Sequence, residues 1–311
     1  MSVAERGLGI DRKIIPATRM DPKIQPFAAV IAVTTDWVIT HISANIVEFL
    51  DIDASVLGHT LDHVLLEDAV HEIRGVLNAT AGHGGAGRLL GCDLRHGYPQ
   101  FDLTIHENET GYVIELEQGE QLSKMDDIGL LRGLMARVKQ ASTPEETADK
   151  AARSIRALTG FDRVSVCRVL DDERGKVVSE ARLPGIRTLL GNEIAAEYVA
   201  DMGNVLNAHA QQQIVADVDA TPAVLMSGPD HAPLDLTHAI SLAPTPRSLA
   251  FLRMHAARAA LSLPIINDGG LIGLVVCHHA KPLRAGFRTR MLVELFVDLF
   301  AHEFAKAATT P

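Results

Sequence analysis

The sequence is poor in positive charge, and this shortage limits the partners that it can bind. It has 29 Lys and Arg residues against 39 Asp and Glu residues, so the formal net charge is -10 at pH 7. Proteins that bind nucleic acids neutralise phosphates with clusters of Lys and Arg. We therefore expect no direct contact with DNA or RNA.

The sequence also lacks a long hydrophobic run. No stretch approaches the roughly 20 apolar residues that a membrane-spanning helix needs. The N-terminal residues MSVAERGLGIDRK contain no apolar core of a signal peptide. We expect a cytoplasmic protein with no membrane contact.

Cysteine is scarce, with Cys92, Cys167 and Cys277 as the three residues of this type. An odd and widely spaced set favours reduced thiols over a disulfide framework. Cys92 and Cys167 lie in predicted strands, so our main interpretation is that they are buried and inert. A thiol redox sensor is the alternative, and it would require an exposed thiol with a low pKa.

The motifs of several enzyme classes are missing. The chain has no GxxxxGK[ST], HExxH or GxSxG segment, so it lacks the chemistry of P-loop nucleotidases and of the common hydrolases. Cys277, His278 and His279 are consecutive, but side chains alternate between the two faces of a strand, so at most Cys277 and His279 could share a metal. We predict neither a metal site nor an enzyme.

The composition is that of a globular protein, with 47% hydrophobic and 22% charged residues. A chain of 311 residues is long enough for about two domains. We predict an arm over residues 1–22, a first domain over 23–120 and a second over 128–308. The patterns predict the following elements: strands at 28–33, 37–42, 88–94, 100–106, 111–117, 163–169, 175–181 and 214–218, and helices at 71–79, 128–138, 144–158, 194–209 and 287–307.

The clearest local signal lies near the C-terminal end of the second domain. Two apolar runs, 261–266 and 271–277, flank Asn267-Asp268-Gly269-Gly270. A two-residue hairpin turn needs positive φ angles, which Gly adopts without steric cost. These runs are therefore predicted to pair as antiparallel strands.

Three short segments are similar to those of bacterial phytochromes: IQPF at 24–27, PLDL at 233–236 and CHH at 277–279. The resemblance implies an α+β fold in which a PAS domain precedes a GAF domain, each with a central antiparallel sheet and flanking helices. It also implies a figure-of-eight knot, in which the N-terminal arm passes through a GAF loop. Ile24 and its neighbours would then be held by residues 186–254.

The resemblance also identifies where a bilin would bind, and most of these positions carry unsuitable residues. Lys13 occupies the position of the attachment cysteine, and an ammonium group is a poor nucleophile compared with a thiolate. Tyr198 replaces the aspartate that binds the pyrrole nitrogens. Beside the ring system, Asn207 and Ser248 stand where the family has a tyrosine and a histidine. Gln213 and Leu242 stand where the family has the two arginines that hold the propionates.

Four positions of the implied bilin pocket are kept, namely Asp217, Phe251, Ser262 and His278. His278 could instead be an ordinary strand residue, and Asp217 could cap a turn within VADVDA. The hypothesis is therefore a phytochrome-like sensory input module that has lost covalent bilin binding and red/far-red photoconversion, with no cofactor. The alternative is a photoreceptor that holds biliverdin non-covalently or at an unusual attachment point.

The last predicted helix, 287–307, has an apolar stripe wider than one sheet needs to cover. We predict that it forms a homodimer, and the alternative is that the helix packs wholly onto the sheet of the second domain. In the longer natural chain, the resemblance implies a following PHY or other output domain such as a histidine kinase.

Overall fold

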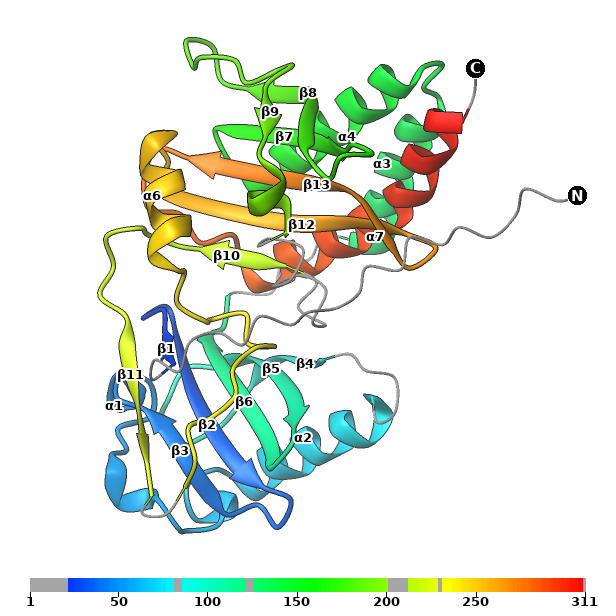
Figure 1. The fold of residues 1–311 in the computed structure, drawn as a ribbon. Coiled ribbons are helices and arrows are strands. Elements are labelled where there is room, and N and C mark those ends of the chain that lie inside the picture. The colour runs from blue at the N-terminus through cyan, green and yellow to red at the C-terminus, as the bar shows by residue number, and fades with distance from the viewer. Residues whose placement is uncertain (1–21, 81–85, 121–125, 201–211, 229–230, 310–311) are drawn as a thin grey trace, which may run out of the picture.

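The computed structural model describes residues 22–80, 86–120, 126–200, 212–228 and 231–309. Within these residues, two antiparallel sheets stand one above the other, a seven-stranded N-terminal sheet below and a six-stranded C-terminal sheet above (Figure 1). Helices flank both sheets, so the predicted α+β architecture is confirmed. No helix in these described ranges is long and apolar enough to cross a membrane.

The N-terminal sheet has the strand order β1-β11-β3-β2-β6-β5-β4. Its continuous part follows the predicted hairpin and meander, with β2 (Ala28–Thr34), β3 (Ile39–Ser43), β4 (Gly87–Cys92), β5 (Phe101–Asn108) and β6 (Gly111–Gln118). Between β3 and β4 the chain forms α1 (Ile46–Leu50), two 3-10 turns at Ala54–Val56 and Leu61–His63, and α2 (Glu67–Thr80). These helices cover one face of the sheet over an apolar core that includes Ile31, Leu103 and Ile114.

Two strands of the N-terminal sheet come from distant parts of the chain. They are β1 (Lys23–Ile24) and β11 (Ala223–Ser227), and β11 pairs with both β3 and β1. The sequence pattern did not indicate β11, because it is short, partly exposed and paired with residues far away in sequence. The segment after β1 is held as predicted, since the amide of Gln25 donates to the carbonyl of Ser241 at 2.8 Å. The predicted knot also involves residues 1–21, which lie outside the described residues, so it stays a prediction.

The C-terminal sheet has the strand order β10-β12-β13-β7-β8-β9. Its strands are β7 (Arg163–Val169), β8 (Gly175–Arg182), β9 (Glu193–Ile194), β10 (Gln213–Val215), β12 (Ala259–Asn267) and β13 (Gly270–His279). The turn between β12 and β13 has φ of 50° at Asp268 and 77° at Gly269. Two positive φ angles give a turn whose twist matches that of the flanking strands, as a two-residue hairpin requires. The predicted hairpin is therefore confirmed.

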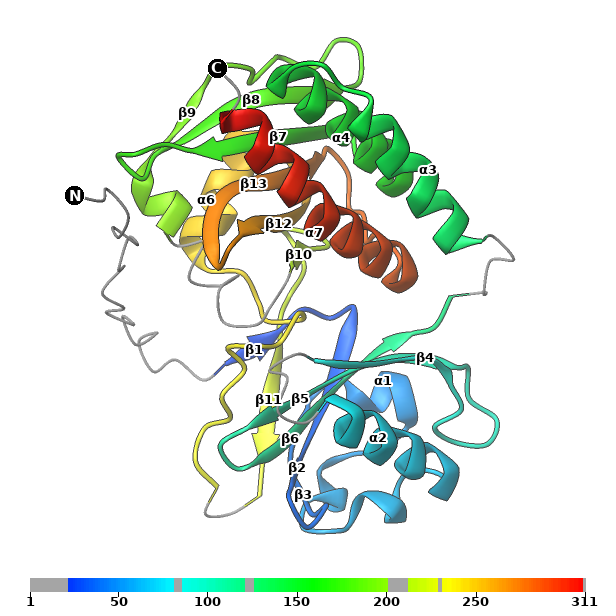
Figure 2. The ribbon, with the colours of Figure 1, turned by 90° about the vertical axis from the view of Figure 1, so that its right-hand side faces the viewer.

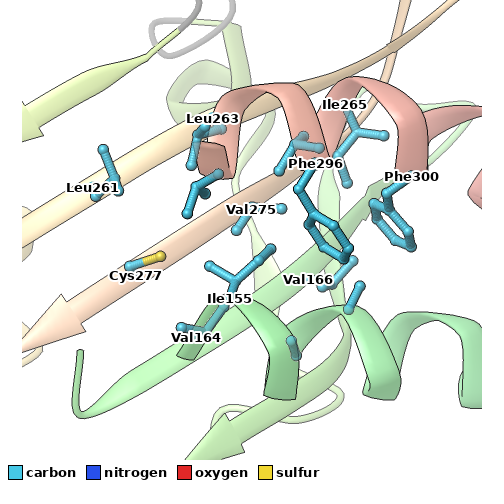
Figure 3. Close-up of a cluster of buried hydrophobic side chains, with 14 of the residues drawn as sticks. Ile155, Val164, Val166, Leu261, Leu263, Ile265, Val275, Cys277, Phe296 and Phe300 are labelled. Carbon is cyan, nitrogen blue, oxygen red and sulfur yellow. The ribbon is translucent and has the colours of Figure 1, made fainter. Parts of the chain in front are cut away.

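Three helices cover one face of the C-terminal sheet, and α6 (Pro246–Met254) lies on the other (Figures 1 and 2). The three are α3 (Asp127–Lys139), α4 (Pro144–Thr159) and α7 (Phe287–Thr309). Helix α4 has the predicted start, since the hydroxyl of Thr143 accepts from the amide of Glu146 at 3.1 Å. Phenylalanines recur every fourth residue of α7 and fill the core beneath it, where Phe296 and Phe300 point at the strands (Figure 3).

The predicted helix over residues 194–209 is wrong at its start. Ile194 belongs to β9, where it pairs with Gly175 of β8. A helical turn begins only at Ala196 and continues to Ala200, and residues 201–209 lie outside the described residues. The sheet edge outweighs the helical pattern here, because the apolar side chain of Ile194 packs into the sheet cluster around Val177 and Val199.

Candidate functional site

The face of the C-terminal sheet that carries α6 is the face on which the resemblance places the bilin, and we call it the pocket face. Residues opposite one another on paired antiparallel strands point to the same side of a sheet. Two rows of residues therefore cross the pocket face: Val215, Ala260, His278 and Arg163 in one, and Gln213, Ser262, Val276 and Ser165 in the other. Cys277 points to the opposite face, into the core shown in Figure 3.

Four rings lie against one another above the pocket face, and we call Tyr198, Phe251, His255 and His278 the ring cluster. The ring centroids of Tyr198 and Phe251 are 4.8 Å apart, and those of Phe251 and His255 are 4.3 Å apart. His278 lies 5.9 Å from His255 and 6.4 Å from Phe251. These separations are typical of packed aromatic pairs. The rings of Phe251 and His255 therefore pack next to His278 on the pocket face.

His278 is the most deeply buried member of the ring cluster, with 6% of its surface exposed. Among the described residues, neither ring nitrogen of His278 has a hydrogen-bond partner. The pKa of His278 is lowered to about 3, mainly by burial and also by the nearby His255 and Arg163. The imidazole is therefore neutral over the whole physiological range.

A buried ion pair lies on the pocket face beside His278. The Nε of Arg163 is 2.9 Å from Oε1 of Glu180, and 6% and 3% of these side chains are exposed. Glu180 also accepts from the hydroxyl of Thr188 at 2.7 Å and from the amide of Leu189 at 3.1 Å. The pair is thus bound to the loop that follows β8, which fixes the floor of the site.

The outer edge of the ring cluster carries a cation. The guanidinium carbon of Arg247 lies 4.9 Å from the ring centroid of Tyr198, within the range of a cation–π contact. Arg247 also forms an ion pair with Glu197 at 2.7 Å. Tyr198 therefore contacts both Arg247 and Phe251.

Asp217 lies after β10, where it forms a bidentate ion pair. Its two oxygens are 2.7 Å and 2.8 Å from Nη2 of Arg258. It also accepts from the amide of Asp219 at 3.1 Å, so it caps the turn within VADVDA. The carboxylate of Asp217 is thus used within the fold.

The structure separates the remaining predicted site residues. Gln213 and Ser262 face each other on the pocket face. Leu242 packs instead in an apolar cluster with Ile24 and Val113, towards the N-terminal sheet. Ser248 lies in the first turn of α6, where its amide donates to Thr245. Lys13 and Asn207 lie outside the described residues.

Several residues that complete the pocket face were not predicted from the sequence. His255 follows Phe251 by four residues, so helical spacing could have indicated that the two rings meet. Arg163 and Glu180 lie on the neighbouring strands β7 and β8. Their ion pair could have been predicted only from the register between these strands, which the sequence does not determine. Arg247 had no local signal.

All three cysteines of the chain are buried. Burial raises the pKa of Cys167 to about 12 and raises that of Cys277 further. The pKa of Cys92 is also raised to about 12, by burial and by the neighbouring Glu72. These thiols stay protonated at neutral pH, and the thiolate is the nucleophilic form of cysteine.

A separate cavity of about 340 Å³ lies between the two sheets. Gln25, Pro26 and Phe27 form one wall, and the other walls come from residues 216–220 and 282–284. Of the predicted site residues that the structure describes, Asp217 is the one in its lining, and no residue of the ring cluster lines it. The cavity is therefore distinct from the ring cluster.

Comparisons with known proteins agree with this architecture. The family model described as GAF domain matches residues 143–307, and the model described as PAS fold matches residues 18–119. Phytochrome-like protein Cph1 of Synechocystis is 28% identical over 291 residues, which is 88% of this chain and 38% of the relative. The bacteriophytochrome of Pseudomonas aeruginosa is 25% identical over 278 residues, with the same coverage of both chains. The chain thus spans well under half the length of these relatives.

Solved structures share the fold at low sequence identity. The chromophore-binding domain of the Stigmatella aurantiaca bacteriophytochrome superposes with a TM-score of 0.82 at 23% identity, covering 91% of this chain and 95% of that chain. The chromophore-binding domain of an unusual bacteriophytochrome from R. palustris superposes with a TM-score of 0.80 at 24% identity, covering 92% and 95%. The chain belongs to the GAF domain family, carries a PAS fold before its GAF domain, and is a homologue of the bacteriophytochromes.

Proposed function

We propose that this chain is a phytochrome-like sensory input module that has lost covalent bilin binding and conventional red/far-red photoconversion. The ring cluster is the observation that carries this proposal. The resemblance implies that Tyr198 replaces the family's pyrrole-binding aspartate, and its ring packs 4.8 Å from Phe251, so on this interpretation the two rings would overlap the bilin. A bilin could enter only if these rings moved apart.

The cysteines support the same proposal. Covalent attachment needs a thiolate at the mouth of the pocket, and burial keeps all three thiols of this chain protonated. The family's attachment position carries Lys13. The same burial and raised pKa values give no support to a thiol redox sensor.

The groups that would bind the bilin's charges are also absent from the expected positions. Leu242 contacts Ile24 in an apolar cluster, and Gln213 carries no charge. Two propionates would then lose their guanidinium partners, and leaving a carboxylate unpaired in a partly buried site is costly. Asp217 offers no replacement, since it is an anion already paired with Arg258.

Incubation of the purified protein with biliverdin tests the proposal. We expect no zinc-dependent fluorescent band on a denaturing gel for the natural chain. The matched control is Lys13→Cys, which restores a thiol at the family's attachment position. A fluorescent, red-absorbing adduct of the natural chain that survives denaturation would contradict the proposal.

His278 favours one alternative, a module that holds biliverdin non-covalently. Its ring nitrogens are buried and have no partner among the described residues, which leaves them available to a ligand. An absorbance titration of the native protein with biliverdin distinguishes the two hypotheses. Saturable binding that is lost in His278→Leu would favour the alternative.

We further propose that the module signals as a homodimer through α7. Leu295 and Leu299 lie one turn apart on α7 and are 49% and 46% exposed, and Ile128 on the neighbouring α3 is 66% exposed. Exposed apolar groups gathered on adjacent helices are typical of a protein interface. Because the chain spans 38% of the first two relatives, the output would come from a following PHY or kinase domain, and this chain itself would have no catalytic activity.

A further inference from the structure

A buried acidic pair lies where the PAS sheet meets the GAF loop formed by residues 231–245, which we call the junction loop. Glu115 and Glu117 are alternate residues of β6 and point to the same face, and 2% and 3% of their surfaces are exposed. The junction loop passes along this face and leads into α6 (Figure 1). Two carboxyl groups are therefore buried between the two domains.

Glu115 binds the backbone of the junction loop directly. Its oxygens accept from the amide of Ile240 at 3.0 Å and from the amide of Ser241 at 2.7 Å. The hydroxyl of Ser241 donates to the same carboxyl group. A carboxylate on the PAS sheet thus holds two successive residues of the GAF loop.

The two glutamates differ in their compensating charge. Glu117 has two cationic partners, Arg290 and Arg284, with the Arg284 Nη1 at 3.1 Å. Among the described residues, the one ionisable partner within ion-pair distance of Glu115 is His106 of β5, whose Nδ1 is 3.9 Å away. Glu115 is therefore a buried carboxyl group without a fixed positive charge beside it.

His106 cannot supply that charge near neutral pH. The pKa of His106 is lowered to about 4, mainly by burial and also by the facing His238 of the junction loop, while Asp235 opposes this shift. Neither ring nitrogen of His106 has a hydrogen-bond partner among the described residues. His106 is thus a neutral imidazole with a free acceptor nitrogen, placed beside the carboxyl group of Glu115.

Burial without a counter-charge disfavours the ionised form of a carboxyl group. The pKa of Glu115 is raised to about 7, mainly by burial and also by the neighbouring Glu117, against the opposing effect of the hydrogen bonds from Ser241 and Ile240. Glu115 therefore changes its charge within the physiological range. This change occurs at an interface between two domains.

The junction loop links Glu115 to the rest of the GAF domain. Its Ser241 carbonyl accepts from the amide of Gln25, and its Ala243 amide donates to the carbonyl of Lys23 at 2.9 Å. The loop then leads into α6, which carries Phe251 of the ring cluster. A shift at residues 240–241 would consequently reach β1 and α6 together.

We propose that Glu115 is a proton-responsive joint between the PAS sheet and the junction loop. When ionised, Glu115 accepts three hydrogen bonds from residues 240–241. When protonated, the neutral carboxyl group is a weaker acceptor, and its proton can lie on the side of His106, whose Nδ1 is 3.9 Å from Oε1, so the hold on the loop loosens. The joint goes beyond the proposed function, because it requires no bilin.

Solution NMR of the full chain over about pH 5.5 to 8.5 tests the joint. We expect the amide resonances of Ile240, Ser241 and Ala243 to shift together along one titration curve with a midpoint near neutral pH. Glu115→Gln should abolish this titration, because the amide side chain does not ionise in this range. Glu107→Gln on the exposed end of β5 is the matched control and should leave the titration unchanged.

Infrared spectroscopy of the natural chain gives a second test that needs no folded variant. The carbonyl band of a buried protonated carboxylic acid should be present at about pH 5.5 and absent at about pH 8.5. Amide resonances of residues 240–243 that stay constant over this range, or that titrate equally in Glu115→Gln, would overturn the proposal. Whether biliverdin binds bears only on the proposed function, and whether residues 240–243 titrate bears only on the joint. The two inferences are therefore tested separately.

Discussion

Arg290 of α7 donates a hydrogen bond to Glu117 of β6, and only 1% and 4% of the two side chains are exposed. One turn further along α7, Glu294 forms an ion pair with Arg88 of β4 at 2.6 Å. The helix that completes the GAF core is therefore bound to the PAS sheet by one buried ion pair and by a second whose arginine is 17% exposed. Any movement of α7 must break or carry these contacts.

Replacement of Arg290 by methionine should destabilise the protein by about 3 kcal/mol, because a buried carboxylate then loses one of its partners. Arg284 remains beside Glu117 and limits the loss. The double variant Glu117→Gln with Arg290→Met should recover part of it, since the buried carboxylate is then removed as well, and Arg284, whose side chain is 25% exposed, stays in contact with water. Urea unfolding measures the stability of both variants. The control is Arg153→Met, which removes an exposed partner of Asp149 and should change the free energy of unfolding by less than about 1 kcal/mol. Equal effects of Arg290→Met and Arg153→Met would contradict the burial argument.

Glu115 should make the protein less stable as the pH rises. Its pKa in the fold is about 7, above the ordinary value of 4.5, so its stabilising contribution is complete below about pH 4.5 and is lost as the pH rises to about 7. Between about pH 5 and pH 8 the natural chain should lose about 2 kcal/mol relative to Glu115→Gln. Urea unfolding at the two pH values measures this difference. If the free energy of unfolding changed equally with pH in the two proteins, Glu115 would not titrate in this range.

His278 should act in the opposite direction. Its pKa falls from the ordinary value of 6.5 to about 3 in the fold, so its contribution is present above about pH 6.5 and is lost as the pH falls below that value. The natural chain should lose about 1 kcal/mol per pH unit between pH 6 and pH 4 relative to His278→Gln. The exposed His302 offers a control, because His302→Gln should follow the natural chain. If the free energy of unfolding of His278→Gln fell equally steeply with decreasing pH, His278 would be excluded as the cause.

Local signals predicted most of the fold. The Asp268-Gly269 turn was identifiable because positive φ angles restrict the residues that can occupy it, and α4 was identifiable from Thr143 and Pro144 at its start. Strands β1 and β11 could not be predicted in the same way. Their pairing depends on segments about 200 residues apart, and neither contains a strong strand pattern of its own.

The candidate site was predicted in part. The resemblance placed Tyr198, Phe251 and His278 in one pocket, and the structure brings these three rings together. Leu242 was predicted beside them, yet it packs against Ile24, because an apolar side chain in that loop gains more by joining the cluster at the PAS sheet. The contribution of His255 depended on how α6 crosses β13, which only tertiary packing determines.

The exposed stripe on α7 leads to a prediction about assembly. Leu295 and Leu299 are about half exposed, while Phe296 and Phe300 on the other side of the helix are fully buried, so charges introduced at 295 and 299 should leave the core intact. If α7 forms the homodimer, the double variant Leu295→Glu with Leu299→Glu should weaken dimerisation at least tenfold, because it places like charges across an apolar interface. Analytical ultracentrifugation over a range of concentrations measures this change. Ile266→Glu is the matched control, since Ile266 is 40% exposed at the far end of β12. A natural chain that stays monomeric at high concentration, or a dimer that Ile266→Glu disrupts as strongly, would exclude α7 as the interface.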